Sequence, residues 1–146
     1  MPGTSFRKWP EFKKYLTTLD NLPDVICSQG SHLMSKYRPS IPHYCLIRKD
    51  RPSSRGKGRG LIVCVKLSLD FSEVDATLPT GNNLEILGVT VHGFSVFNVY
   101  NPPSNILIST TFDFLSNFAR VILVVISTFI TECGAVNARK VTAGLW

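Results

Sequence analysis

The sequence lacks an apolar run long enough to cross a membrane. Its longest, at residues 121–130, includes Ser127 and Thr128, whereas a spanning helix needs about 20 apolar residues. The start, MPGTSFRKWPEF, has no hydrophobic stretch of the kind that a secretory signal carries. Transit peptides are basic and acid-poor, as this chain is up to Glu11, but a docked first helix explains these residues as well. We expect an intracellular chain with no membrane segment.

The sequence also has few residues of the types that hold zinc or form a redox disulfide. It contains 4 cysteines, at positions 27, 45, 64 and 133, and no two of them have C-x-x-C spacing. The 3 histidines do not cluster with them, so the spacing predicts no zinc site and no thioredoxin-type centre. Three of the cysteines lie in apolar runs, which favours buried and reduced thiols.

Length and net charge limit the number of domains and the kind of binding partner that this chain can have. A chain of 146 residues fits one domain, and 44% hydrophobic residues can supply its core. Lysine and arginine number 16 against 10 acidic residues, for a net charge of +6. That excess is compatible with nucleic acid or another acidic surface as partner, but it identifies neither.

Apolar spacing predicts a mixed chain of class α+β. One face of a first helix is formed by Trp9, Phe12, Leu16 and Leu19. Apolar segments predict strands at residues 24–27, 43–49, 61–67, 84–91 and 94–100. The last two form a hairpin, with His92-Gly93 as a two-residue turn.

A second helix and a final strand are predicted further along. Thr110 or Thr111 can cap the helix, whose apolar side holds Phe112, Leu115, Phe118 and Ala119. The β-branched run at residues 121–130 is typical of a strand buried on both faces. Residues 138–146 are expected to form a loosely ordered tail.

Short motifs follow one another from Trp9 to about Asn137. They are WPEF at 9–12, PDVICSQ at 23–29, IRKDRP at 47–52, a glycine-rich basic loop, NVYNPPS at 98–104 and RVILV at 120–124. In this order and spacing they resemble the endonuclease domain of non-LTR retrotransposons, a member of the endonuclease/exonuclease/phosphatase superfamily. Each motif alone is weak, and the ordered set carries the resemblance.

The resemblance implies both a fold and a setting. The fold is a four-layered α/β sandwich, with two sheets face to face and helices outside. Residues 1–137 would be a partial copy of it, without the family's first strand and C-terminal part. The resemblance also implies magnesium-dependent cleavage of DNA, a reverse transcriptase domain following in the same polyprotein, and the nucleus as location if the chain is functional.

The residues that this reaction requires are only partly present. The N-x-Y-x-P motif is intact at Asn98, Tyr100 and Pro102, and the resemblance gives Tyr100 a hydrogen bond to the phosphate. The family's metal-binding glutamate and aspartate correspond to Gly30 and Ile126. Neither can ligate magnesium, which prefers carboxylate oxygens. We therefore expect no bound metal or other cofactor here, and an inactive nuclease.

Alternative interpretations of these residues stay open. Tyr100 can instead be a strand-end aromatic that packs beside Pro102, and Asn98 a hydrogen-bonding sheet residue. Glu132, on the stretch after the last strand, is the acid that a working nuclease would use in place of the lost ligands. A working nuclease of this kind would show magnesium-dependent nicking of DNA that Glu132→Ala abolishes.

The basic loop at residues 48–60 supports a further function. The residues that we expect to bind nucleic acid there are Arg48, Arg51, Arg55, Lys57 and Arg59, the last three interleaved with glycines. A flexible cluster of this kind can follow phosphates by counterion release. The alternative to an inert remnant is thus a non-catalytic, nucleic-acid-binding pseudonuclease. A solvated loop without a ligand explains the same residues.

Overall fold

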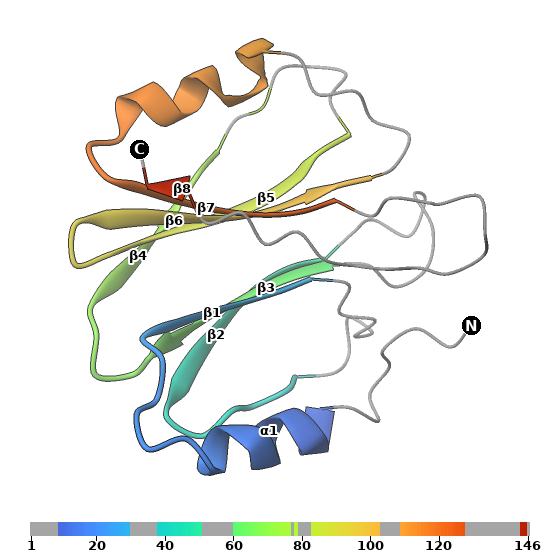
Figure 1. Cartoon of the computed structure of the whole chain (residues 1–146), viewed down its shortest axis with the longest axis vertical. Coiled ribbons are helices and arrows are strands. Elements are labelled where there is room, and N and C mark those ends of the chain that lie inside the picture. Colours follow the sequence, from blue (N-terminus) through green and yellow to red (C-terminus); the bar gives the residue numbers. More distant parts are fainter. Residues whose placement is uncertain are drawn as a thin grey trace. The chain divides into compact units, whose positions relative to one another are not determined.

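The computed structural model describes residues 9–29, 38–50, 60–76, 78, 83–102, 109–127 and 144–145. It contains helices and two β-sheets (Figure 1), so the chain is of class α+β. The chain divides into two compact units, residues 1–70 and 71–146. Neither helix of the described residues is long and apolar enough to cross a bilayer.

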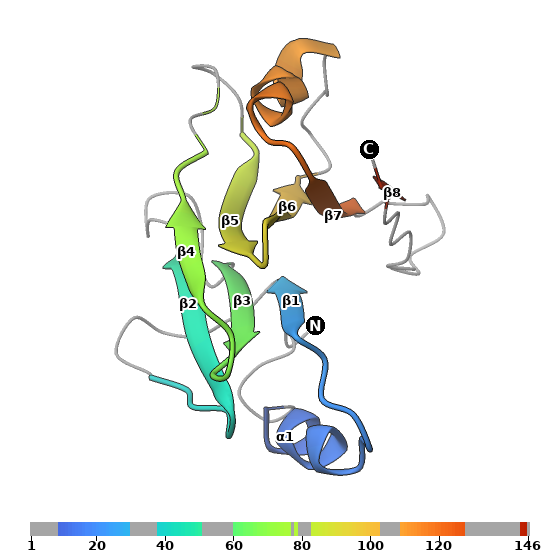
Figure 2. The ribbon, with the colours of Figure 1, turned by 90° about the vertical axis from the view of Figure 1, so that its left-hand side faces the viewer.

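The first unit is a helix on a three-stranded sheet. Its elements are α1 (Trp9–Thr17), β1 (Val25–Gln29), β2 (Tyr44–Asp50) and β3 (Gly60–Lys66). The strand order is β1-β3-β2, and both pairings are antiparallel. Figure 2 shows α1 against one face of this sheet. Residues 61–65 of the central strand are all buried, whereas the edge strand β1 is half-buried throughout.

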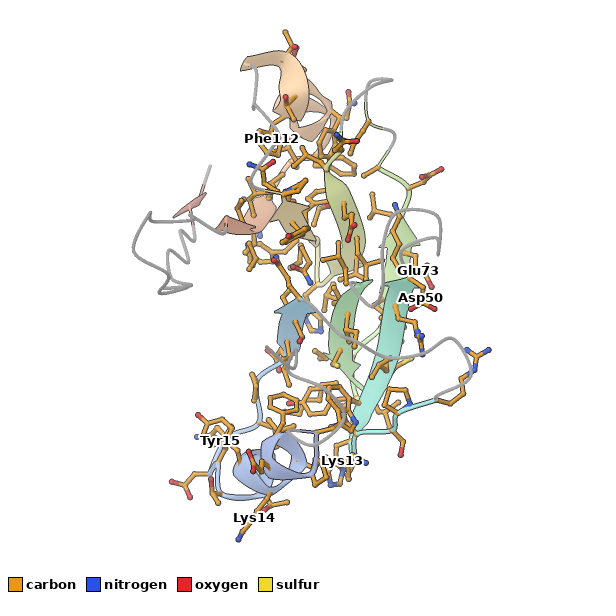
Figure 3. All side chains as sticks on the ribbon, turned by 90° about the vertical axis from the view of Figure 1, so that its right-hand side faces the viewer. Lys13, Lys14, Tyr15, Asp50, Glu73 and Phe112 are labelled. Atoms are coloured by element: carbon orange, nitrogen blue, oxygen red, sulfur yellow. The ribbon has the colours of Figure 1, made fainter. Side chains whose placement is uncertain are left out.

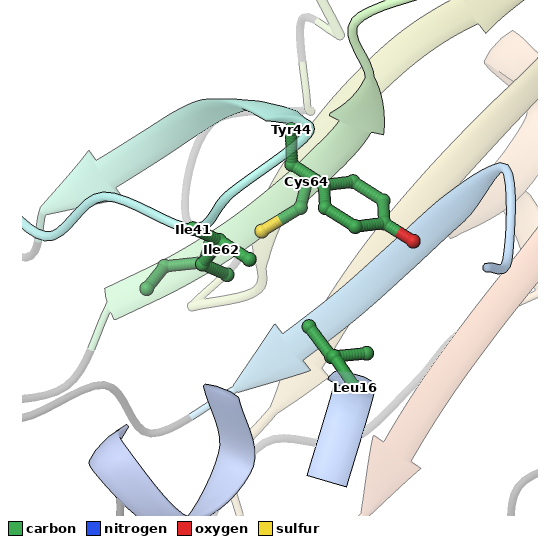
Figure 4. Close-up of a cluster of buried hydrophobic side chains, with 5 residues drawn as sticks. All are labelled: Leu16, Ile41, Tyr44, Ile62 and Cys64. Atoms are coloured by element: carbon green, nitrogen blue, oxygen red, sulfur yellow. The ribbon is translucent and has the colours of Figure 1, made fainter. Parts of the chain in front are cut away.

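The core of this unit confirms the predicted apolar face of α1. Leu16 packs with Ile41, Tyr44, Ile62 and Cys64 (Figure 4), and Trp9, Phe12 and Leu19 lie against that cluster. The Tyr44 hydroxyl donates a 2.6 Å hydrogen bond to the Pro23 carbonyl. This bond ties the segment after α1 to the start of β2.

The second unit is a five-stranded sheet covered by a 3₁₀-helix. Its elements are β4 (Phe71–Val74), β5 (Glu85–Val91), β6 (Phe94–Asn101), η3 (Ser109–Asn117), β7 (Val121–Ser127) and β8 (Gly144–Leu145). They pair in the order β4-β5-β6-β7-β8, and only β6 and β7 run parallel. Parallel neighbours require a crossover connection, and η3 lies in it.

The predicted hairpin is confirmed, including its turn. His92 has φ 50° and Gly93 φ 75°, which is the type I′ geometry that follows the twist of the flanking strands. Below η3, Phe97 of β6 meets Phe114 and Phe118 edge-on, at ring-centroid distances of 5.4 and 5.1 Å. Phe97 is fully buried and forms the centre of this core.

Three predictions about these elements differ from the structure. The second helix is 3₁₀, and its three residues per turn align Phe112, Leu115 and Phe118 while leaving Ala119 exposed. Of the β7 residues whose side chains are described, Val121 is buried and residues 122–125 are half-buried, so this part of the strand is not buried on both faces as expected. Strands β4 and β8 were not predicted, and β8 lies within the expected tail.

Candidate functional site

Asn98 and Tyr100 share one face of β6, as the period of two in a strand predicts. The opposite face carries Phe97 and Val99, which belong to the core below η3. Asn98 is fully buried, in register with Leu87 of β5 and Val124 of β7. Tyr100 keeps 8% of its surface exposed. Asn98 and Tyr100 therefore lie at the middle and near the end of a central strand that is paired on both sides.

The parallel pairing of β6 with β7 places Tyr100 in register with Ile126. The position where the resemblance expects an aspartate therefore lies beside the retained tyrosine. A hydrocarbon side chain at that position provides no oxygen for a metal ion.

A carboxylate residue lies on the other side of Tyr100, on β5. Glu85, the first residue of β5, is in register with Tyr100 and half-buried. The sequence could have predicted this pairing, because the two-residue turn at His92-Gly93 fixes which residues of β5 and β6 lie opposite each other. Among the described residues, however, no three His, Cys, Asp or Glu side chains are grouped to hold a metal ion, at Glu85 or elsewhere.

The remaining predicted catalytic positions lie elsewhere in the chain. Gln29 ends β1, in register with Leu61 of β3. Gly30, which follows it, lies outside the described residues, and so does Glu132. The interpretation of Gly30 as a lost metal ligand therefore stays a prediction.

Of the five predicted nucleic-acid-binding residues, the described part of the chain includes Arg48. Its guanidinium donates to both carboxylate oxygens of Asp50, at 2.7 and 2.8 Å from Nη2, and its Nε lies 2.9 Å from Oδ1. The Arg48 side chain is only 11% exposed. Arg48 is thus engaged by a carboxylate two residues away on the same side of β2. Arg51, Arg55, Lys57 and Arg59 lie outside the described residues.

Two of the described cysteines, Cys27 and Cys64, are poor nucleophiles. Burial raises the pKa of the Cys27 thiol to about 11. Burial, with Cys27 and Cys45 nearby, raises the pKa of Cys64 to about 12. Both thiols therefore stay protonated near neutral pH, and only the thiolate is nucleophilic. All three described cysteines are free.

No family model matches this chain, and no curated protein matches it. Its function is therefore argued from its residues and their arrangement.

Proposed function

We propose that the chain is a catalytically inactive relative of the retrotransposon endonuclease domain, corresponding to the N-terminal part of that domain. The motif order at residues 9–124 supports this. The order of elements along the chain is compatible with it: a helix, an antiparallel sheet, a hairpin, then a crossover to a parallel strand. The proposed fold is a partial copy of the family's four-layered α/β sandwich.

The observation that carries the proposal is the register of Tyr100 with Ile126. A magnesium-dependent nuclease needs carboxylates to hold an ion against the scissile phosphate. Here the tyrosine of the family's motif is retained and its strand neighbour is a hydrocarbon. Without that acid the ion, and the transition-state stabilisation it supplies, are lost.

The direct test is nicking of a supercoiled plasmid by the full chain, with and without magnesium. We expect no magnesium-dependent nicking. Nicking that requires magnesium would contradict the proposal. Nicking lost specifically in Glu132→Ala would then identify the substitute acid.

A gain-of-function variant tests the assignment of the two lost ligands. The double change Gly30→Glu and Ile126→Asp should bind Mn²⁺, measured by electron paramagnetic resonance of the free ion, more tightly than either single change. Moving the aspartate by one strand position, as Gly30→Glu with Val125→Asp, puts it on the opposite face and is the matched control. Equal Mn²⁺ binding by both double variants would contradict the assignment.

Nucleic-acid binding by residues 48–60 is the second candidate. Arg48 is paired with Asp50, but the neighbouring Lys49 is exposed, and Arg51, Arg55, Lys57 and Arg59 follow within ten residues. A gel shift of duplex DNA at low and moderate salt separates the two candidates. An inert remnant gives no shift, whereas a phosphate-binding loop gives one that weakens steeply with salt.

A further inference from the structure

The first unit contains a pocket of about 280 Å³ beside the C-terminal half of α1. Leu16 and Ile41, both buried, belong to its lining, and Leu19 and Leu22 add further apolar surface. The pocket therefore offers a hydrocarbon surface of limited size. Pockets for drug-sized ligands are larger, at about 300–1,000 Å³.

Two nitrogen-bearing side chains also line the pocket. Lys13 is half-buried and His43 is exposed. Among the described residues no carboxylate forms an ion pair with either of them. Figure 3 shows Lys13 and Lys14 leaving α1 in different directions, and only Lys13 belongs to the pocket. Beside apolar surface, an ammonium group that has no acidic partner among the described residues favours a ligand that is both apolar and anionic.

The backbone holds His43 at this place in a conformation that histidine rarely adopts. Its φ is 69°. The Tyr44 amide donates to the Ile41 carbonyl at 3.2 Å, closing a turn with Pro42 and His43 at its centre. This is a type II arrangement, in which glycine is usual at the third position. The His43 carbonyl also accepts from the Leu67 amide at 2.8 Å. Strained positions of this kind are concentrated at binding sites.

We infer that this pocket binds a small amphipathic monocarboxylate. The hydrocarbon chain lies on Leu16, Leu19, Leu22 and Ile41, and the carboxylate accepts hydrogen bonds from Lys13 Nζ and the His43 ring. A ligand with a hydrocarbon chain of roughly eight carbons fits a pocket whose volume is just below that of pockets for drug-sized ligands. This inference does not depend on the nuclease resemblance.

The test is binding of octanoate to the full chain, measured by NMR titration, with octanol as the uncharged comparison. We expect octanoate to bind with Kd of about 1 mM, from the number of its atoms, and to shift the methyl signals of Leu16, Leu19 and Ile41. Octanol should bind about three- to tenfold more weakly, because it lacks the charge. Equal binding of the two, or no binding of octanoate, would overturn the inference.

Matched variants locate the carboxylate. Lys13→Met keeps the hydrocarbon stem and should weaken octanoate binding about three- to tenfold without affecting octanol. Lys14→Met makes the same change outside the pocket and should have no effect. His43→Gly removes the ring and fits the turn, so the fold is kept while octanoate binding falls. Equal loss in Lys13→Met and Lys14→Met, or unchanged binding in His43→Gly, would contradict the assignment.

Discussion

The ring of Phe97 occupies the space in which a side chain at Gly88 would lie. The two residues are directly opposite each other on β6 and β5. A Cβ atom added to Gly88 would lie 2.7 Å from Cε1 and 2.8 Å from Cδ1 of Phe97. Phe97 cannot move aside easily, because Phe114 and Phe118 hold its ring edge-on. The glycine is thus a packing requirement of the core below η3.

Gly88→Ala is therefore expected to lower the free energy of unfolding by about 1–3 kcal/mol through overpacking. Urea denaturation measures this. Ser72→Ala, at an exposed position of β4, is the control and should stay within about 0.5 kcal/mol of the wild type. Phe97→Leu should reduce the loss of unfolding free energy caused by Gly88→Ala, because it removes the ring atoms that the added methyl group would contact. An equal cost in both backgrounds would show that the Phe97 ring is not the cause.

The second prediction separates the two interpretations of Tyr100. If its role is to pack in the sheet, Tyr100→Phe should change stability by only about 1 kcal/mol, and Tyr100→Ala should cost about 3–5 kcal/mol. Neither should change the DNA gel shift relative to the wild type. A Tyr100→Phe variant of unchanged stability but weaker DNA binding would instead assign the hydroxyl to the phosphate.

The strands of this chain were largely predictable, because residues that alternate or run apolar in the sequence also pair in the sheets. Residues 84–100 show this best, since a two-residue turn fixes both the hairpin and its register. Strand β4 escaped prediction because two of its four residues, Ser72 and Glu73, are exposed and polar. This segment forms a strand because it pairs with β5. Such a pairing depends on the tertiary structure and is not indicated by the local sequence pattern.

The candidate site was predictable only in part. Asn98 and Tyr100 were expected on one face from strand periodicity, and their register confirms it. The pairing of Arg48 with Asp50 was missed, although residues two apart on a strand share a face. The number of cations in the sequence did not indicate that the Asp50 carboxylate lies within hydrogen-bonding distance of Arg48.

The third prediction concerns the dependence of stability on pH. Burial raises the pKa of Cys27 to about 11 and that of Cys64 to about 12, against 9.0 for an ordinary thiol. Above pH 9 the unfolded chain therefore loses protons that the folded chain keeps. The stabilisation that depends on these thiols is complete below pH 9 and is lost as the pH rises towards 12. Burial also raises the pKa of Tyr44, which acts in the same direction.

Urea midpoints between about pH 8 and about pH 10 should accordingly fall with rising pH. The double variant Cys27→Ala and Cys64→Ala should show a shallower decline over the same range, whatever its stability at neutral pH. A decline of the same steepness in the double variant would exclude the thiols as its source.

The last prediction uses the ion pair between Arg48 and Asp50 to test the basic loop. Asp50→Asn removes the ion pair with the Arg48 guanidinium and raises the net charge by one. Because the Asp50 side chain is 43% exposed, the loss of the pair should cost less than about 1 kcal/mol in urea denaturation. Asp70→Asn makes the same charge change at another exposed position and is the control. For an inert remnant, neither variant shifts duplex DNA at moderate salt. Tighter DNA binding in Asp50→Asn than in Asp70→Asn, with a salt dependence steeper by about one released ion, would instead show that the segment starting at Arg48 contacts phosphate.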